Sequence, residues 1–427
     1  TVVVTCEEDA TPYYIRGTLY GFLYGTPPVL TNGSELLTVG SNGSFQFIMP
    51  VPSGQTYDVT VKTQPTLPGQ VCRVVNGNGT VSGQDVTDVA VRCGLPSLIL
   101  LAGGSSGLLM GDFVRGGGWV TLTDSAITNH GGTSLAMNAD GLGLGLVRNA
   151  SNSVLDDVTW SIGSWSDLAQ VDSNTTRARP EVSASGASLQ GLFHGDDYHL
   201  YYMAYDDGIY SPVAEDTGSY GPIAGAVTAR VTDATMVFVN GADSNKFYAR
   251  DRVGGTWQAA SWLSDDTQYR SSWIQPSIVT LEPASTAADL LAVVVGSDAG
   301  STQLKFFRRT GGTWSSSAAV PDATTSDPVS LVALAGGNAY LAFRGTNGQV
   351  YGTTYSKSAG TWSAVENLVA TTVTGTPAVA MGVFDAALEL VYVDAETGVA
   401  RHKRLVNGIW SAAVDIGGTG LNAVSLA

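Results

Sequence analysis

Hydrophobic and polar residues alternate along most of the chain in short runs, and glycine-rich turns separate these runs. Near the N-terminus, Ser44–Ile48 and Tyr57–Val61 alternate in this way between Asn-Gly, Pro-Gly and Ser-Gly turns. Such alternation indicates antiparallel strands that bury one face, and these turns favour tight hairpins. We therefore predict a small β-sandwich over residues 11–94.

The rest of the chain carries a repeated glycine–aromatic motif. Its seven aromatic anchors are spaced by 46, 45, 47, 57, 48 and 48 residues, and the longest interval contains an insertion. A period of this length fits four short strands with their turns, which is one blade of a β-propeller. Five prolines keep the same phase and precede predicted inner strands, where no ladder donor is needed. The anchors are Trp119, Trp165, Tyr210, Trp257, Trp314, Trp362 and Trp410, and the prolines are Pro180, Pro222, Pro276, Pro328 and Pro377.

The two ends of this repeated region complement each other. The first repeat lacks an inner strand, whereas Leu421–Ala427 has the pattern of an inner strand with no blade after it. We predict that this C-terminal strand completes the first blade, which closes the ring without an exposed sheet edge. The predicted fold class is all-β, with a sandwich followed by a seven-bladed β-propeller over residues 95–427.

Charge and cysteine content narrow the partners and the compartment. The net charge of −16 repels phosphate backbones and anionic lipids, and no apolar run reaches the roughly 20 residues of a membrane span, so we expect neither nucleic-acid binding nor membrane insertion. Cys72 and Cys93 lie on the predicted last strands of the sandwich, where a disulfide would stabilise the fold by roughly 3 kcal/mol. Two unpaired buried thiols are the alternative. A disulfide favours an extracellular or cell-surface location, against cytosolic free thiols.

The N-terminal region resembles the immunoglobulin-like repeat of large bacterial surface proteins. The resemblance rests on Leu37–Phe47, Ser53–Val61, Val71-Cys72 and Asp85–Cys93. It implies an immunoglobulin-like β-sandwich that acts as a stalk module at the cell surface and performs no chemistry.

The first ten residues form a separate element in this interpretation. Thr1–Cys6 matches the predicted closing strand Asp88–Cys93, so the chain begins with what looks like the last strand of another repeat. This strand either packs locally or pairs head-to-tail with a neighbouring molecule, in which case Cys6 could lock the joint. The predicted assembly residues are Val2, Val3, Val4 and Cys6.

The candidate ligand site lies on one face of the propeller. The turns between second and third strands and the crossovers between blades emerge on the same face, together with the insertion. Carboxylates and aromatic rings gathered there could bind sugar hydroxyls or a calcium ion, although Asp and Asn are also what tight turns select. The predicted ligand-binding residues are Asp243, Asp265, Asp266, Tyr269, Arg270, Trp273 and Asp298; Trp160 and Trp262, outside the aromatic register, are further candidates for exposed rings.

Two repeats, Asp251–Trp257 and Arg309–Trp314, resemble both the Asp-box of sialidases and the blades of fucose-binding propeller lectins. The lectin resemblance implies shallow, repeated glycan sites between blades or at the loop face. Separately, we predict no cofactor, with a calcium ion as the alternative. We expect no catalytic residues and no metal ligands. Gly103–Gly107 matches the nucleophile-elbow pattern, but that motif needs a strand-to-helix turn, whereas a β-hairpin is predicted here. His194 and His199 are expected to point to opposite faces of a strand, so they would not bind one metal ion together. The predicted function is therefore non-catalytic carbohydrate binding or adhesion. An extracellular filament subunit is the alternative, and a propeller glycoside hydrolase is the third.

Overall fold

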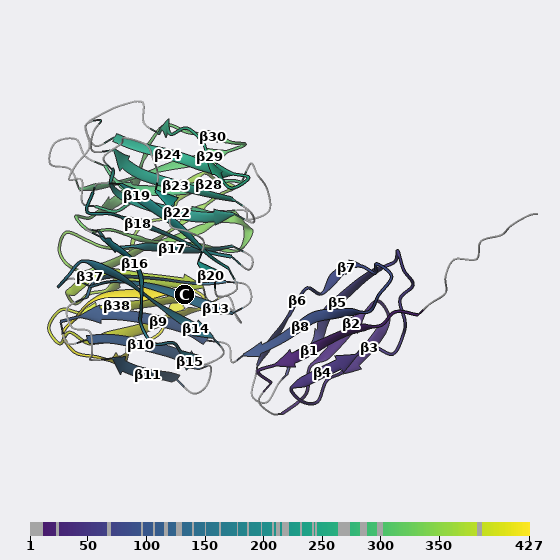
Figure 1. The fold of residues 1–427 in the computed structure, drawn as a ribbon. Helices are drawn as coiled ribbons and strands as arrows, with labels where there is room; N and C mark the ends of the chain where they lie inside the picture. Colours follow the sequence, from purple (N-terminus) through teal and green to yellow (C-terminus); the bar gives the residue numbers. More distant parts are fainter. Residues whose placement is uncertain are drawn as a thin grey trace, which may run out of the picture. The chain divides into compact units, whose positions relative to one another are not determined.

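The structure is a computed structural model, and the chain divides into two compact units, Thr1–Pro96 and Ser97–Ala427. Figure 1 shows that both units are built from β-strands. The structure describes residues 12–22, 25–65, 70–94, 97–105, 107–114, 118–124, 130–138, 141–149, 151–161, 164–176, 178–185, 188–197, 199–206, 209–210, 214–215, 222–230, 233–240, 243, 246–263, 274–281, 288–296, 302–381 and 387–427.

The first unit is a sandwich of two four-stranded sheets. One sheet has the order β4-β1-β8-β6, and the other has the order β3-β2-β5-β7. The first and last strands, β1 and β8, pair in parallel, whereas the other pairs are antiparallel. The strands are β1 Ile15–Tyr20, β2 Val29–Asn32, β3 Glu35–Thr38, β4 Gly43–Gln46, β5 Thr56–Thr63, β6 Val71–Val75, β7 Asn78–Thr80 and β8 Val86–Gly94.

Alternation along these strands places one apolar face of each sheet in a shared core. β1 has alternating buried positions, and Ile15 and Leu19 are fully buried against Phe45 and Phe47. Cys72 and Cys93 lie directly opposite each other on β6 and β8 and form the predicted disulfide inside this core.

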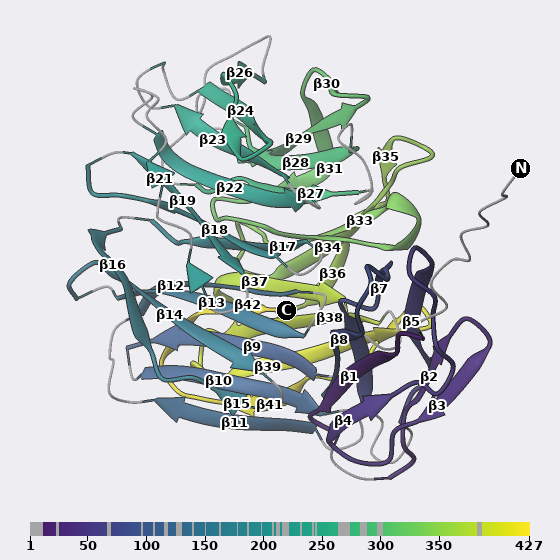
Figure 2. The ribbon, with the colours of Figure 1, turned by 45° about the vertical axis from the view of Figure 1, so that its right-hand side comes forward.

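The second unit is a propeller of seven sheets in the described residues (Figure 2). In blades 2 to 7 the first strand of the blade in sequence is the inner strand. Blade 1 contains β9 Ser97–Gly104, β10 Gly107–Val114 and β11 Gly118–Asp124. Blade 2 contains β12 His130–Met137, β13 Leu142–Asn149, β14 Val154–Ser161, β15 Ser164–Trp165 and β16 Ala169–Thr175. Blade 3 contains β17 Glu181–Ser185, β18 Ser188–His194, β19 Leu200–Asp206, β20 Ile209–Tyr210 and β21 Ala214–Glu215. Blade 4 contains β22 Pro222–Arg230, β23 Asp233–Asn240, β24 Lys246–Val253, β25 Thr256–Trp257 and β26 Ser261–Trp262.

The remaining blades repeat this arrangement. Blade 5 contains β27 Ser277–Thr280, β28 Leu290–Val295, β29 Gln303–Thr310, β30 Thr313–Trp314 and β31 Ala318–Thr324. Blade 6 contains β32 Ser330–Ala333, β33 Ala339–Arg344, β34 Val350–Ser356, β35 Thr361–Trp362 and β36 Glu366–Val369. Blade 7 contains β37 Val373–Met381, β38 Leu388–Asp394, β39 Ala400–Val406, β40 Ile409–Trp410 and β41 Val414–Gly417.

The C-terminal strand β42, Leu421–Leu426, is the inner strand of blade 1. It pairs with β9 and completes a sheet of order β11-β10-β9-β42, and Figure 2 shows it beside β9 and β37. The ring is therefore closed by joining the last strand to the first blade. This confirms the predicted fold class, a β-sandwich followed by a propeller that the C-terminal strand closes.

The anchor tryptophans pack against the preceding blade, as expected for ring-building residues. Trp257 of blade 4 meets Tyr202 of blade 3 edge to face, with ring centroids 5.1 Å apart. Trp362 meets Phe306 of blade 5 at 5.7 Å, and Trp119 of blade 1 meets His402 of blade 7 at 5.3 Å. Second strands such as β23, β28 and β38 are buried throughout, because neighbouring blades cover both of their faces.

One expectation about the aromatic residues is wrong. Trp160, expected to be exposed, is only 3% exposed and lies in a cluster with Ile99 and Met110. It sits on β14, a third strand whose two faces both contact neighbouring blades, so leaving the aromatic register does not expose it. Trp262, by contrast, is 48% exposed on β26.

Several predictions fall on residues outside the described ranges. The assembly strand with Val2, Val3, Val4 and Cys6 is among them, so its pairing stays a prediction. Among the helices of the described residues, none has the length and hydropathy of a membrane-crossing segment.

Candidate functional site

The predicted loop face exists, and backbone hydrogen bonds fix it. In two pairs of neighbouring blades, the crossover strand is bonded to the turn between the second and third strands of its own blade and to the same turn of the next blade. In blades 2 and 3 the bonds run from Thr176 N to the Ser153 carbonyl and from Asp196 N to the Thr175 carbonyl. In blades 6 and 7 they run from Val373 N to the Gly348 carbonyl and from Ala395 N to the Thr372 carbonyl. Turns and crossovers therefore share one face of the ring.

Of the predicted ligand-binding residues, the structure describes Asp243. It lies in the turn between β23 and β24 of blade 4, on the loop face. The others lie outside the described residues, so their grouping stays a prediction; these are Asp265, Asp266, Tyr269, Arg270, Trp273 and Asp298.

Asp243 belongs to a cluster of polar and aromatic side chains on blade 4. Its carboxylate accepts a 2.6 Å hydrogen bond from the Tyr248 hydroxyl and lies 3.1 Å from the Lys246 ammonium. These two contacts hold the pKa of Asp243 below its ordinary value. The Lys246 ammonium in turn lies 4.5 Å from the centroid of the Trp262 ring, and Tyr248 and Trp262 are direct cross-strand neighbours. We call Asp243, Lys246, Tyr248 and Trp262 the blade 4 cluster.

A tyrosine holds this turn in three blades, a feature that the sequence reasoning missed. In blades 3, 4 and 6, a phenylalanine near the end of the second strand stacks on a tyrosine near the start of the third. The tyrosine hydroxyl bonds an Asp or Asn in the turn between them. The stacked pairs are Phe193–Tyr201, Phe238–Tyr248 and Phe343–Tyr351, and the turn residues are Asp197, Asp243 and Asn347. The signal in the sequence is Phe and Tyr placed symmetrically four or five residues on either side of Asp or Asn. These acidic and amide turn residues thus serve the fold as well as facing the surface.

A small pocket of about 250 Å³ opens on the loop face between blades 5 and 6. Asp322 of β31 contributes an exposed carboxylate and has a φ of 55°, which is uncommon for a residue other than glycine. The Gln303 amide holds the bulge of β31 around Asp322 by donating to the carbonyls of Val320 and Ala323. Blade 6 supplies Phe343, Thr346, Asn347 and Tyr351 to the opposite wall. The pocket therefore combines a carboxylate, a hydroxyl, an amide and the edge of an aromatic pair.

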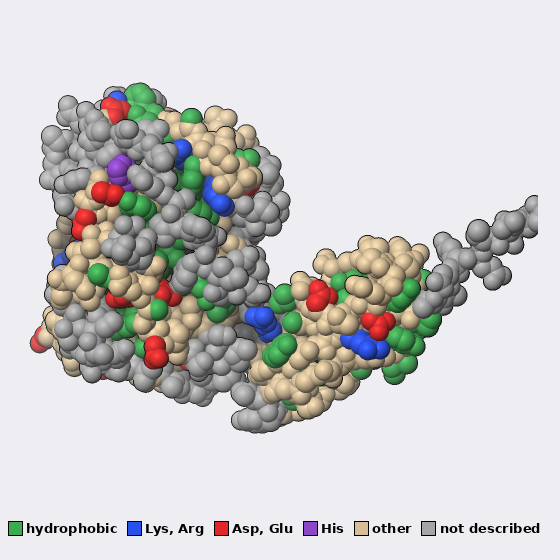
Figure 3. All heavy atoms as spheres, in the orientation of Figure 1, with side chains coloured by type: hydrophobic (Ala, Val, Ile, Leu, Met, Phe, Trp, Pro, Cys, Tyr) green, Lys and Arg blue, Asp and Glu red, His purple; other side chains and the backbone are tan. Residues whose placement is uncertain are grey.

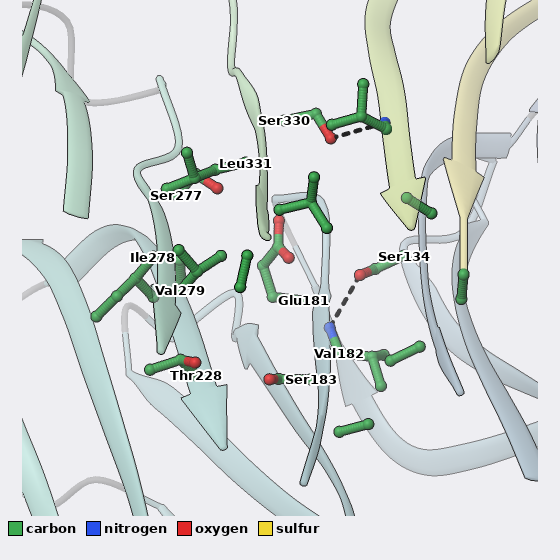
Figure 4. Close-up of a pocket in the computed structure, with 18 of the residues that line it drawn as sticks. Ser134, Glu181, Val182, Ser183, Thr228, Ser277, Ile278, Val279, Ser330 and Leu331 are labelled. Carbon is green, nitrogen blue, oxygen red and sulfur yellow. Dashed lines mark hydrogen bonds between the residues drawn. The ribbon is translucent and has the colours of Figure 1, made fainter. Parts of the chain in front are cut away.

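The inner strands of the propeller enclose a central channel with a volume of about 680 Å³ (Figure 4). All seven inner strands line it, mostly with small aliphatic and hydroxyl side chains. Several hydroxyls bridge adjacent strands, such as Ser134, which accepts a hydrogen bond from Val182 N, and Ser330, which accepts one from Val379 N. Glu181 is the acidic residue among the described residues of the wall. Burial raises its pKa, although the Arg179 charge and the Ser134 hydroxyl partly oppose this shift.

The acidic pair Asp156–Asp157 lies inside a blade and not on the loop face. Asp156 and Asp157 are buried within blade 2, where burial and then the neighbouring charge raise the pKa of Asp156. In the view of Figure 3, acidic side chains are scattered over the propeller and form no single patch. Within the described residues, no group of three or more His, Cys, Asp or Glu side chains is placed to hold a metal ion.

No protein-family model matches the chain, and no curated protein matches it. Among solved structures, a triple arginine-to-alanine mutant of AofleA from Arthrobotrys oligospora is similar at a TM-score of 0.51 and 10% identity, covering 70% of this chain and 89% of that one. A mutant of the Aleuria aurantia lectin AAL in complex with Fucα1-6GlcNAc has a TM-score of 0.47 at 11% identity, covering 67% of this chain and 96% of that one. The Hadza microbial sialidase Hz136 has a TM-score of 0.46 at 12% identity, covering 86% and 77%. The AofleA match supports the propeller fold, and the two weaker matches carry no argument about ligand or activity.

Proposed function

We propose that the propeller is a non-catalytic carbohydrate-binding domain that holds glycans on its loop face. The observation that carries this proposal is the blade 4 cluster, in which the half-exposed Trp262 ring lies beside the Asp243–Lys246 ion pair. A sugar ring has an apolar C–H face, which stacks on an aromatic ring, and a rim of hydroxyls, which need charged or polar partners. The cluster supplies both kinds of surface within one patch.

The interblade pocket supports a second contact on the same face. Asp322 offers an exposed carboxylate, and Asn347 and Thr346 add polar groups to the same pocket as the Phe343–Tyr351 pair. A pocket of about 250 Å³ admits a single sugar unit rather than a long chain inside the protein. Two shallow sites on one face fit a domain that retains branched or repeated glycans by multivalent contact.

The channel gives less support to glycoside hydrolysis. Such hydrolysis generally needs two carboxyl groups roughly 5–10 Å apart. Among the described residues that line the channel, Glu181 has no second carboxylate beside it. Binding therefore accounts for the described surface better than catalysis does.

We further propose that the first unit is an immunoglobulin-like stalk that displays the propeller outside the cell. A two-sheet sandwich whose first and last strands pair in parallel, with a core disulfide, supports this role. A disulfide persists in oxidising compartments, which supports an extracellular location.

A glycan array probed with the full chain tests the proposed function. We expect Trp262→Ala to weaken retention of bound glycans by about 1–3 kcal/mol without lowering the melting temperature, because an exposed ring contributes little to the core. Trp257→Ala is the matched control. It removes a ring packed between blades, so it should lower the melting temperature. The proposal is wrong if the wild-type protein retains no glycan, or if Trp262→Ala binds as the wild type does.

A further inference from the structure

The strand registers define one layer of residues across the central channel. In every blade, one inner-strand residue pairs with a second-strand residue that lies two or three positions before the last residue of that second strand. Four of these seven residues are serines, two are alanines, and one is a glutamate. In blade order they are Ser425, Ser134, Glu181, Ala226, Ser277, Ser330 and Ala378.

The serines of this layer join neighbouring blades. Ser134 of blade 2 accepts a hydrogen bond from Val182 N of blade 3 at 2.9 Å, and Ser425 of blade 1 donates to the Thr133 carbonyl of blade 2 at 2.7 Å. In blade 3 this role has moved by two residues, because Ser183 accepts the hydrogen bond from Ala229 N. Glu181 therefore occupies a layer position whose joining function another residue performs.

The described part of the chain places no cation in an ion pair with the Glu181 carboxylate, although the Arg179 charge and the Ser134 hydroxyl partly stabilise its ionised form. Among the described residues, no lysine, arginine or histidine forms an ion pair with it. Arg179 lies two residues earlier, but its guanidinium extends to the Ser425 hydroxyl, at 3.4 Å. Figure 4 shows the Glu181 side chain within the channel, among Ser134, Ser277 and Leu331. A partly desolvated carboxylate without a close counter-ion is costly, and a cationic ligand would offset that cost.

The rest of the channel wall indicates what else the ligand carries. Partly exposed aliphatic side chains line it, among them Met137, Val279, Leu331 and Met381. Layer hydroxyls such as Ser134, Ser330 and Ser425 are already engaged between strands, so they offer less to a polyol. A volume of about 680 Å³ leaves room for a body of several carbon atoms beside the carboxylate.

We propose that the central channel binds a small organic ammonium ion, with its charged nitrogen at Glu181 and its apolar body against the aliphatic wall. This site is separate from the loop-face surface and goes beyond the proposed glycan binding. Because the ligand needs an ionised carboxylate, its affinity should rise as the pH passes upward through the pKa of Glu181, which burial raises.

Calorimetry on the full chain tests this with three probes that share a shape or a charge: cyclohexylammonium chloride, cyclohexanol and potassium chloride. We expect cyclohexylammonium to bind saturably. Cyclohexanol should bind with an affinity lower by about tenfold or more, and potassium should not bind. Equal binding of cyclohexanol, a response to potassium of the same size, or no saturable heat with cyclohexylammonium would overturn the proposal.

Two variants locate the binding. Glu181→Ser introduces the residue that four other blades carry in this layer, so the fold should tolerate it, and Glu181→Gln keeps the size of the side chain in case it does not. Both should weaken cyclohexylammonium binding by about tenfold or more, whereas Ser277→Ala, in the same layer, should leave it unchanged. Wild-type affinity in Glu181→Gln would refute the assignment. Loop-face glycan retention should not change in any of these variants, so the two proposals fail independently.

Discussion

Deleting residues 421–427 should unfold or aggregate the propeller, because it removes the strand that closes the ring. Leu421, Val424 and Leu426 are only 4%, 2% and 7% exposed, and each contributes about 1.5–3 kcal/mol when buried. Together they supply about 5–9 kcal/mol, which is comparable to the whole stability of a typical domain. The deletion also strips β9 of its inner partner and leaves an unpaired sheet edge.

Denaturant unfolding and sedimentation of the full and shortened chains measure this effect. The smaller change Leu421→Ala should destabilise the propeller by about 2–5 kcal/mol. The control is Ile409→Ala, which removes an aliphatic side chain that is 74% exposed on β40 and should change little. The reasoning fails if the shortened chain stays monomeric and unfolds at the wild-type denaturant concentration.

Three further perturbations test individual contacts. Replacing both Cys72 and Cys93 with alanine should destabilise the first unit by about 3 kcal/mol, since the bridge closes a loop with a sequence separation of 21, and reductant should have no further effect on that variant in denaturant unfolding. His402→Ala should destabilise the propeller by about 2 kcal/mol in the same assay, because it removes a 2.7 Å partner from the 1% exposed Glu389, which keeps the Arg404 guanidinium at 3.0 Å; a loss below about 1 kcal/mol would contradict this. Tyr248→Phe should raise the pKa of Asp243 toward its usual value of about 3.9, which an NMR titration would show. A carboxyl group whose pKa is lower in the folded than in the unfolded state stabilises the fold at pH values above its unfolded-state pKa, and this stabilisation is lost as the pH falls through its folded-state pKa. The wild type should therefore lose more stability below about pH 4 than the Tyr248→Phe variant.

The architecture could be predicted because its signals repeat. An aromatic anchor recurs once per blade, and Trp119, Trp257, Trp362 and Trp410 each pack on the blade before their own, so the period of the sequence equals the period of the ring. Closure was predictable for a related reason: Leu421–Leu426 has the pattern of an inner strand, and the first repeat lacks an inner strand of its own. The disulfide followed from two cysteines on strands expected to end the sandwich, and these strands are neighbours in one sheet.

The surface sites were less predictable, because one residue type serves two purposes on them. Asp243 was chosen as a ligand residue for its place in a turn, yet its carboxylate also binds the Tyr248 hydroxyl within that turn. Sequence alone does not separate a turn-holding Asp from a ligand-binding one. Trp160 shows the opposite limit: it leaves the aromatic register but lies on a third strand, whose two faces are both covered. The exposure of an aromatic ring depends on which strand of the blade carries it, and the spacing of the repeats alone does not predict that exposure.

Departures from the repeat are the places where this propeller can differ from a purely structural ring. A side chain that appears at the same position in most blades is explained by blade packing, as are the anchor tryptophans and the serines of the channel layer. Glu181 replaces a serine in that layer, and Trp262 adds a ring outside the aromatic register. Asp322 adopts a φ of 55° in a bulge. No interblade contact described above depends on these three side chains, and a partly buried carboxylate or an uncommon backbone conformation carries a cost that packing between blades does not offset. For this reason both proposals of ligand binding are placed at these departures and not at the repeated positions.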